Sequence, residues 1–494
     1  MLKKFRLTLA LLFFAFLTLL FLDFTGTLHL WLGWMAKIQL IPAVLAHSAV
    51  IILGIILFTL LFGRVYCSVI CPLGTFQDGV SRLSKKRRKK RFRYARPSTW
   101  LRYGMLALFV VAMVAGVSVI VSLFDPYAAY GRMASNFLAP VYYWGNNLLA
   151  WYAERINSYA FYTTSVWLKS GITFGITAAT FVIISILAWL NGRIYCNTVC
   201  PVGTFLGFFS RFSIFKVVLD REKCTRCGLC ERQCKASCID VENMRIDHSR
   251  CVGCFNCIGS CKSHSIKYTP LKREKTNKPE LSDDSTGISR RKVLGVMALL
   301  ATGSVVKVKA QMDGGVASIE NKKIPERKTP LTPPGSQGAA HLKQHCTACQ
   351  LCISACPNHV LRPSNKLATL MQPEMSYERG YCRPECTECS QVCPNNAIKR
   401  ITTAEKSAIS IGFAVWMKEN CVVNTDHVPC TNCERHCPTG AITLVPRDPN
   451  QENSLKIPTI DKERCIGCGA CENLCPARPF SAIYVEGNIR HHQI

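Results

Sequence analysis

The arrangement of cysteines constrains this chain more than any other feature of its sequence. Residues 224–234 read CTRCGLCERQC and residues 251–261 read CVGCFNCIGSC, two copies of the spacing Cys-x-x-Cys-x-x-Cys-x-x-x-Cys. Three closely spaced thiolates bind three irons of one [4Fe–4S] cube, and the displaced fourth thiolate binds the neighbouring cube. We therefore expect one cluster on Cys224, Cys227, Cys230 and Cys261, and a second on Cys251, Cys254, Cys257 and Cys234.

The spacing separates these runs from other uses of cysteine. Zinc sites usually pair two short hooks and do not repeat runs of four. Lys235 and Lys262 stand where bacterial ferredoxins usually carry proline, and we expect this change to affect reduction potential but not ligation. Cys238 belongs to neither run, and we expect it to be a small buried residue beside the cluster.

Four further runs lie in the C-terminal region, and each ends in Cys-Pro: CTACQLCISACP, CRPECTECSQVCP, CVVNTDHVPCTNCERHCP and CIGCGACENLCP. They predict four more cubes and six [4Fe–4S] clusters in the whole chain. The expected ligands are Cys346, Cys349, Cys352, Cys356, Cys382, Cys386, Cys389, Cys393, Cys421, Cys430, Cys433, Cys437, Cys465, Cys468, Cys471 and Cys475.

Spacing also suggests which of these four runs exchange their fourth cysteines. The first and fourth runs are regular, whereas the second and third have longer first gaps, so our hypothesis is that like pairs with like. Cys475 would then join the run that starts at Cys346, and Cys356 would join the run that starts at Cys465. The two irregular runs would exchange Cys393 and Cys437 in the same way.

Four apolar stretches occupy the first 190 residues, at 6–22, 41–62, 103–124 and 172–190. Each is long enough to cross a hydrocarbon core of ~30 Å as a helix. Buried core helices of a soluble protein are the alternative, which four such stretches in succession make less attractive. The expected fold is multi-domain, with an α-helical membrane domain of four spans and ferredoxin-like α+β polyferredoxin domains.

The distribution of positive charge predicts how these spans are oriented. Residues 1–310 contain 40 Lys and Arg against 14 Asp and Glu, whereas residues 311–494 contain 20 against 17. Basic residues gather before the first span and at 85–93, so the positive-inside rule predicts a cytoplasmic N-terminus and loop 64–101. Residues 23–40 and 125–171 then face the other side. Because no nucleic-acid motif accompanies the basic run, we expect no nucleic-acid partner, and binding of RNA or anionic lipid by that run is the alternative.

A repeated motif follows the second and fourth stretches: GRVYCSVICPLGTF at 63–76 and GRIYCNTVCPVGTF at 192–205. Each repeat supplies Cys-x-x-x-Cys-Pro where an apolar helix meets the cytoplasmic face, so four thiols could converge between the helices. They could hold a metal or a cluster, form redox-active disulfides, or border a quinone site. The cysteines concerned are Cys67, Cys71, Cys196 and Cys200.

Between the two cysteine-rich regions, the sequence SRRKVLGVMALLATGSVVKVKA at 289–310 resembles a twin-arginine export signal. Clusters are inserted in the cytoplasm, so a loaded domain must cross the membrane folded, which suits this export route. The segment could remain as a short anchor or be cleaved after Ala310. An amphipathic linker between two cytoplasmic ferredoxin domains is the alternative. The Pro/Gly/Ser-rich stretch at 325–340 suggests a tether.

The expected organisation has five parts. They are a membrane domain at 1–215, a cytoplasmic two-cluster ferredoxin domain at 216–275, a signal or anchor at 285–310, a linker at 311–340, and a periplasmic four-cluster ferredoxin domain at 341–494.

This organisation resembles two known families fused in one chain. Residues 1–275 are similar to the NapH family of membrane ferredoxins, and residues 285–494 to the NapG/MauM family of exported ferredoxins. The resemblance implies a quinol dehydrogenase in a bacterial inner membrane. It would pass electrons from the membrane quinol pool to a periplasmic reductase or cytochrome acceptor. Reductases of the nitrate and nitrous oxide type both fit, and similar modules serve methylamine oxidation.

No catalytic residue can be assigned from the sequence. There is no visible acid/base pair, nucleophile constellation or nucleotide loop, and no Cys-x-x-Cys-His that would attach a c-type haem. His29 and His47 near the outer ends of the first two spans are candidate quinone neighbours, as are Tyr66 and Tyr195 beside the repeated motif. For the two histidines we favour an interfacial role with hydrogen bonds to backbone or water, whereas the two tyrosines could equally be interface anchors. The alternative function is a redox assembly or maturation factor for a periplasmic metalloenzyme.

Overall fold

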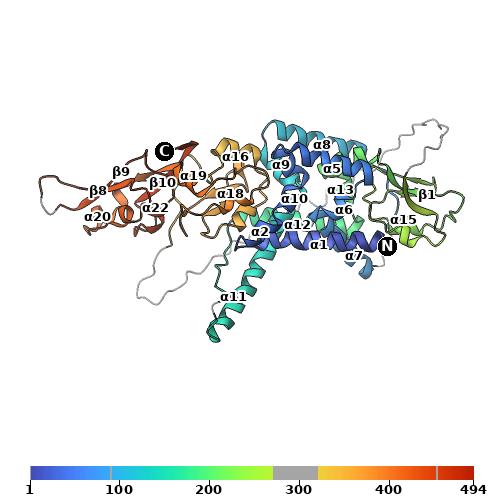
Figure 1. The fold of residues 1–494 in the computed structure, drawn as a ribbon, viewed down its shortest axis with the longest axis horizontal. Helices are drawn as coiled ribbons and strands as arrows, with labels where there is room; N and C mark the ends of the chain where they lie inside the picture. The colour runs from blue at the N-terminus through green and yellow to red at the C-terminus, as the bar shows by residue number, and fades with distance from the viewer. Residues whose placement is uncertain (1, 89–91, 159, 271–320, 452–453) are drawn as a thin grey trace, which may run out of the picture. The chain divides into compact units, whose positions relative to one another are not determined.

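The computed structural model describes residues 2–88, 92–158, 160–270, 321–451 and 454–494. The expected export signal at 285–310 lies outside the described residues. Up to residue 214, the described chain is helical (Figure 1). Its elements are α1 (Leu2–Leu22), α2 (Thr27–Leu32), α3 (Trp34–Lys37), α4 (Leu40–Leu45), α5 (Ala49–Phe62), α6 (Tyr66–Val69), α7 (Pro72–Arg88), α8 (Thr99–Val114), α9 (Ser118–Phe124), α10 (Pro126–Met133), the π-helical turn η1 (Ala134–Leu138), α11 (Ala139–Arg155), α12 (Gly171–Asn191), α13 (Ile194–Thr198) and α14 (Pro201–Ser210).

Two of the four expected spans are unbroken helices, and two are divided. By length and apolar composition, α1 and α12 could cross a membrane. The stretch 41–62 is broken between α4 and α5, where His47 has φ 53°, and 103–124 is broken between α8 and α9, where Gly116 has φ 69°. A residue in the left-handed region ends a helix. Composition alone did not reveal these two breaks.

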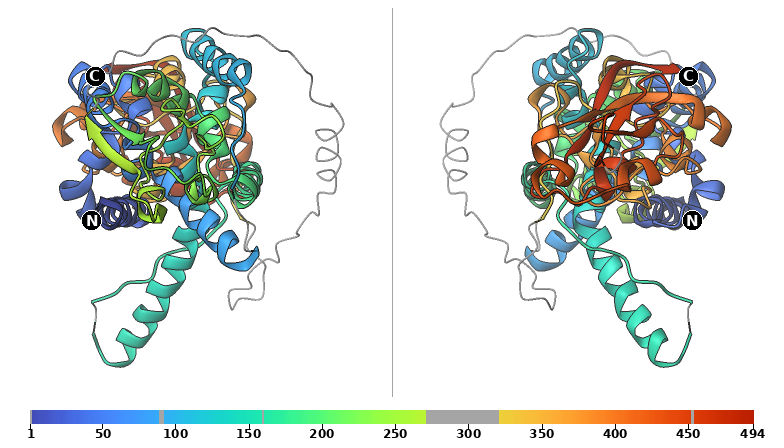
Figure 2. Two further views of the ribbon diagram at one scale, coloured as in Figure 1. Left: turned by 90° about the vertical axis from the view of Figure 1, so that its right-hand side faces the viewer. Right: turned by 90° about the vertical axis from the view of Figure 1, so that its left-hand side faces the viewer.

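The helical region leaves large apolar side chains on its surface. Many of them lie on α1, α5, α8 and α12, and others lie on α2 and α11. Examples are Leu11, Leu12, Phe16, Leu53, Leu57, Val110, Val111, Val114, Val182, Ile183 and Ile186, all at least 38% exposed. Helix α11 extends away from the other helices (Figure 2).

The N-terminal ferredoxin region is a small α+β unit. Strand β1 (Phe215–Leu219) pairs antiparallel with β4 (Ile266–Pro270), and β2 (Ile239–Asp240) pairs with β3 (Arg245–Ile246). Helix α15 (Leu229–Gln233) contains the third cysteine of its run, and the 3-10 turn η2 (Ile258–Ser260) begins just after the third cysteine of the other run. The core consists of Val217, Ile239, Phe255, Ile266 and cysteines of both runs. The expected ferredoxin-type fold is therefore confirmed here.

The C-terminal region has two halves of the same kind. The first contains α16 (Ala339–His345), α17 (Leu351–Ser354), β5 (Leu361–Pro363), η4 (Leu367–Thr369), β6 (Pro373–Met375), α18 (Glu388–Val392) and α19 (Thr403–Ala408). The second contains β7 (Ile409–Trp416), η5 (Lys418–Asn420), α20 (Val422–Thr425), α21 (Asn432–Arg435), β8 (Ile442–Pro446), β9 (Lys456–Ile460), α22 (Ala470–Leu474) and β10 (Ile483–Gln493). Antiparallel pairs join β5 to β6, β7 to β10, and β8 to β9.

The stretch at 325–340, expected to be a tether, is packed against both halves of the C-terminal region instead. Arg327 Nη2 lies 2.5 Å from Glu472 Oε1, and both side chains are at most 4% exposed. The amide of Thr329 donates to Glu486 Oε1 (2.6 Å), and Leu331 is fully buried. A composition rich in Pro and Gly indicated flexibility, but buried partners elsewhere in the chain hold this segment in place.

Helix α12 contacts a different ferredoxin region at each end. At its start, Ser170 Oγ donates to Asn365 Oδ1 (2.6 Å) in the C-terminal region. Just after its end, the amide of Arg193 donates to the carbonyl of Lys235 (2.9 Å) in the N-terminal ferredoxin region. A 21-residue helix is about 31 Å long, about the thickness of a hydrocarbon core.

The Arg327–Glu472 pair allows a test of the packed 325–340 segment. We expect Arg327→Ala to lower the free energy of unfolding by about 3–5 kcal/mol, because it leaves a buried carboxylate unpaired. The readout is thermal unfolding in detergent, followed by tryptophan fluorescence. The control is Lys366→Ala, whose side chain is 52% exposed beside Glu374 and should cost less than about 1 kcal/mol. Equal small effects of both substitutions would contradict the packing.

Candidate iron–sulfur centres and an adjoining cavity

One predicted cysteine set surrounds a cavity in the N-terminal ferredoxin region. Cys251, Cys254, Cys257 and Cys234 line the same cavity, as the exchange of fourth cysteines predicts. Cys238 lines it too, is 1% exposed, and has its Sγ 3.5 Å from Cys234 Sγ. Its position beside the expected cluster agrees with the sequence analysis.

The other set of this region is more open to solvent. Burial and the neighbouring thiolates of Cys224 and Cys227 raise the pKa of Cys230 to about 11. The fourth predicted ligand, Cys261, has its Sγ 3.1 Å from the Ser265 hydroxyl. Hydrogen bonds from hydroxyl groups to cluster sulfurs are one way in which a protein adjusts reduction potential.

In the first half of the C-terminal region, the two consecutive runs exchange fourth cysteines. Cys356 lines a cavity together with Cys382, Cys386 and Cys389. Conversely, Cys393 is an electrostatic neighbour of the first run, whose thiols are Cys346, Cys349 and Cys352.

The second half repeats this arrangement. Cys475 lines a cavity with Cys421, Cys430 and Cys433, and Cys437 is an electrostatic neighbour of Cys465, Cys468 and Cys471. The hypothesis that like runs pair with like is therefore wrong. Consecutive runs pair because the intervening chain is short and closes a small loop, and a longer first gap merely enlarges one turn.

The donor sets fit iron–sulfur clusters. Burial, followed by repulsion from neighbouring thiolates, raises the pKa of Cys352, Cys389 and Cys471 well above the usual range. Thiolates at such positions need bound cations to remain charged, which cluster iron provides. Clusters held there would supply one-electron transfer. Among the described residues, no three His, Cys, Asp or Glu side chains are arranged to hold a single metal ion.

The structure brings together the four thiols of the repeated motif. Cys67 lies in α6, Cys71 immediately precedes α7, Cys196 lies in α13, and Cys200 is the N-cap of α14. All four are at most 6% exposed. Burial and the nearby thiols of the other three raise the pKa of Cys200 well above its usual range. The expected convergence of the two repeats therefore occurs.

A single carboxylate beside these thiols holds three cations. Asp78 in α7 lies 2.6 Å from Arg6, 2.8 Å from Arg193 and 3.3 Å from Lys235. Burial alone would raise the pKa of Asp78, but Arg193, Lys235 and Arg6 hold it well below the usual range. The sequence analysis missed this residue, although it is the only acidic residue between 64 and 101.

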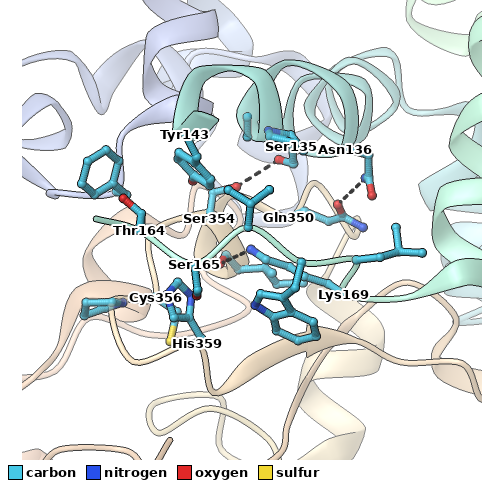
Figure 3. Close-up of a pocket in the computed structure, with 18 of the residues that line it drawn as sticks. Ser135, Asn136, Tyr143, Thr164, Ser165, Lys169, Gln350, Ser354, Cys356 and His359 are labelled. Atoms are coloured by element: carbon cyan, nitrogen blue, oxygen red, sulfur yellow. Dashed lines mark hydrogen bonds between the residues drawn. The ribbon is translucent and has the colours of Figure 1, made fainter. Parts of the chain in front are cut away.

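A cavity of about 360 Å³ lies beside the Cys356 set (Figure 3). Its aromatic lining comes from Phe24, Tyr143, Tyr162 and Trp167, and its polar lining includes Asn136, Lys169, Gln350 and His359. Cys356 itself forms part of the wall. The sequence analysis did not identify these residues, because they come from segments that are distant in the chain and carry no shared motif.

Hydrogen bonds fix the polar side of this cavity, as Figure 3 shows. Asn136 Nδ2 donates to Gln350 Oε1 (3.0 Å), and Lys169 Nζ donates to the carbonyl of Ile353 (3.0 Å). The hydroxyls of Ser135 and Ser354 lie 3.0 Å apart. The cavity is therefore formed jointly by the α10–α12 region and the first C-terminal run.

The four candidate quinone neighbours lie elsewhere. His29 Nδ1 is 3.2 Å from Asp23 Oδ2, and the His47 ring packs against His345 with centroids 5.9 Å apart. The Tyr66 hydroxyl donates to Gln39 Oε1 (3.0 Å), and Tyr195 is 7% exposed. These four side chains do not line the cavity of Figure 3.

The exchange of fourth cysteines can be tested by spectroscopy. We expect Cys475→Ser and Cys433→Ser to alter the same cluster signal in electron paramagnetic resonance spectra, because these thiols line one cavity. Cys349→Ser should alter a different signal. The spectra should be recorded on reduced protein for each variant alone and for the pairs. If Cys475→Ser altered the Cys349 signal instead, the pairing of consecutive runs would be refuted.

Comparisons with known proteins agree with this geometry. The family described as "4Fe-4S binding domain" matches residues 45–91 and 173–219, which contain the repeated motif, and "4Fe-4S dicluster domain" matches residues 428–478. No solved structure matches the chain.

This chain aligns with three known proteins over different shares of their lengths. An uncharacterised Methanocaldococcus jannaschii protein is 51% identical over 49 residues, which are 10% of this chain and 20% of that protein. The Escherichia coli ferredoxin-type protein NapF is 28% identical over 32% of this chain and 87% of its own length. The methylamine utilization ferredoxin-type protein MauM of Methylobacillus flagellatus is 31% identical over 33% of this chain and 70% of its own length. The chain therefore belongs to the family of ferredoxin-type iron–sulfur proteins that includes MauM.

Proposed function

We propose that this iron–sulfur electron-transfer protein is bound to a bacterial inner membrane, oxidises quinol in the cavity of Figure 3, and delivers the electrons to a periplasmic reductase or cytochrome. The observation that carries the proposal is the position of Cys356. It forms part of the wall of an aromatic cavity and also lines the cavity shared by Cys382, Cys386 and Cys389.

The exposed apolar surface supports the membrane part of the proposal. Contiguous apolar patches are rare on soluble monomers, whereas α1, α5, α8 and α12 all expose large aliphatic side chains. Breaks such as those at His47 and Gly116 are tolerated in membranes where neighbouring helices bury the freed backbone groups. The basic residues at the start of α1, and those at 85–93 at the end of α7 and just after it, favour a cytoplasmic location for those ends.

The cavity has the chemistry that a quinol head group needs. Aromatic side chains can pack on the flat ring, and His359 and Lys169 present ring and ammonium nitrogens to its hydroxyl oxygens. Lys169 is held in place by the Ile353 carbonyl. Oxidation of a quinol releases two protons and two electrons. The protons would leave through these polar groups, and clusters can accept the electrons one at a time.

The described contacts also suggest a route outwards. The amide of Cys382 donates to the carbonyl of Cys468 (2.9 Å), so the Cys356 set adjoins the second half of the C-terminal region. That half carries the Cys465 and Cys421 sets, and an acceptor docked there would receive electrons without reaching the helices. By resemblance to Nap and Mau proteins, nitrate and nitrous oxide reductases are candidate acceptors.

The assignment of the cavity can be tested by a matched pair of histidine variants. His359 and His47 both have φ 53°, a conformation that asparagine tolerates, so His→Asn preserves the backbone at both sites. We expect His359→Asn to slow cluster reduction by a menaquinol analogue at least tenfold, because a hydrogen-bond partner of the head group is lost. His47→Asn should leave the rate unchanged. Freeze-quench electron paramagnetic resonance gives the rate, and dithionite reduction checks the cluster content.

Two other outcomes would redirect the proposal. A larger effect at His47 would move the quinol site to the outer end of α5. If menaquinol left every cluster oxidised while dithionite reduced them, direct quinol oxidation would be rejected. A maturation role for a periplasmic metalloenzyme would then be favoured, and deletion of the protein should deplete that enzyme of its cofactor.

A further inference from the structure

The four thiols of the repeated motif form a site that the six ferredoxin sets do not explain. Residues of each repeat support the other repeat. Arg64 Nη2 donates to the carbonyl of Cys196 (3.2 Å), and Arg193 Nη1 donates to the carbonyl of Cys67. The two cysteine loops are thus tied together by a reciprocal pair of arginines.

Two glycines make this crossing sterically feasible. A Cβ atom added at Gly74 would collide with the Cys67 carbonyl and come within 2.9 Å of Arg193 Nη1. At Gly203 it would collide with the Cys196 carbonyl and come within 2.9 Å of Arg64 Nη2. Gly74 and Gly203 therefore leave room for the arginine of the other repeat, and the glycines and arginines together hold the loops at a fixed separation.

The charge around the thiols calls for an anionic ligand. Arg64 is 1% exposed, and none of its hydrogen-bond partners in the described chain is a carboxylate. They are Asn197 Oδ1, Ser249 O, Cys196 O and Cys67 Sγ. Asp78 must compensate three further cations. A buried excess of positive charge is costly unless it is paired. A [4Fe–4S] cluster held by four thiolates is anionic and would neutralise this excess.

Several donors already point at the sulfur atoms. The amide of Gly203 donates to Cys200 Sγ (3.4 Å), Gln77 Nε2 donates to Cys196 Sγ (3.4 Å), and Arg64 Nη2 lies 4.0 Å from Cys67 Sγ. Donors directed at sulfur stabilise thiolates and tune cluster potentials. Redox-active disulfides would not require hydrogen-bond donors directed at three of the four cysteine sulfurs.

We propose that Cys67, Cys71, Cys196 and Cys200 bind a seventh [4Fe–4S] cluster, which exchanges single electrons with the ferredoxin clusters on either side of the helical region. No bond forms or breaks and no proton is needed in each transfer. The existence of the cluster is independent of quinol oxidation. Only its part in that electron route rests on the proposed function.

This site contacts the N-terminal ferredoxin region, and it interacts electrostatically with an arginine that contacts the C-terminal region. On one side, the amide of Arg193 donates to the carbonyl of Lys235, which follows the predicted ligand Cys234. On the other side, Tyr195 is an electrostatic neighbour of Arg132. Arg132 Nη1 in turn donates to the carbonyl of Ala348, beside Cys349 (3.4 Å). The site therefore directly adjoins the loop that contains Cys234, and Arg132, which interacts electrostatically with Tyr195, contacts the loop that contains Cys349.

The first test counts clusters in the unmodified full chain. Native mass spectrometry of protein purified anaerobically in detergent should give the mass of the chain with seven clusters, or about 28 iron atoms. A fully loaded mass with six clusters, or with zinc or disulfides at the remaining cysteines, would overturn the proposal. This measurement involves no quinol, so its outcome does not depend on the proposed function.

A double variant locates the additional cluster. Cys71→Ser with Cys200→Ser should remove about four iron atoms per chain and one component of the Mössbauer spectrum. The control is Thr75→Ser with Thr204→Ser, which alters the same two loops and should retain all the iron. Unchanged iron in the cysteine variant would overturn the assignment. If that variant does not fold, the count in the unmodified chain decides.

Discussion

The helical region and the N-terminal ferredoxin region depend on one buried carboxylate. Asp78 joins Arg6 of α1, Arg193 after α12, and Lys235 of the ferredoxin region. Removal of this carboxylate would leave three cations in a buried environment. Their described ion pairs include no other carboxylate that could compensate this charge. The same carboxylate fixes Arg193, which supports the Cys67 loop. The position of the four thiols therefore follows from the ion pair network.

The repeat explains why two loops far apart in the chain form one site. Each loop is incomplete alone, because its cysteine carbonyl needs the arginine of the other copy. The glycine before each arginine ends the preceding helix, and the proline after the second cysteine starts the next one. Each repeat therefore places a helix end, an arginine and two cysteines at the same spacing. The two repeats together form the four-cysteine site.

The sequence predicted chemistry well where ligand spacing is local, and less well where long-range packing decides. The Cys251 run and its partner Cys234 are brought together as expected, because their spacing reflects cluster geometry directly. The exchange of Cys356 and Cys475 was mispredicted, since gap length says little about which loops close upon each other. The prediction of a tether at 325–340 was wrong because Arg327 pairs with the buried Glu472, which lies 145 residues away in the sequence. The cavity of Figure 3 could not be predicted, because Tyr143, Lys169 and His359 meet only in the folded chain.

The cavity lies at only one end of α12, so the two ends of this helix adjoin different sites. The cavity contains Lys169, which lies just before α12, and Cys356 of the C-terminal region. Electrons released there could reach an outer acceptor through the C-terminal clusters alone, without crossing the helices. The Cys234 and Cys251 sets, which adjoin the other end of α12, would then be unnecessary for that transfer. The proposed seventh cluster would give these sets a role, because it would let electrons enter or leave at their end of α12. With the proposed quinol site and the proposed seventh cluster, electrons would pass at both ends of α12, and quinol would exchange at only one of them.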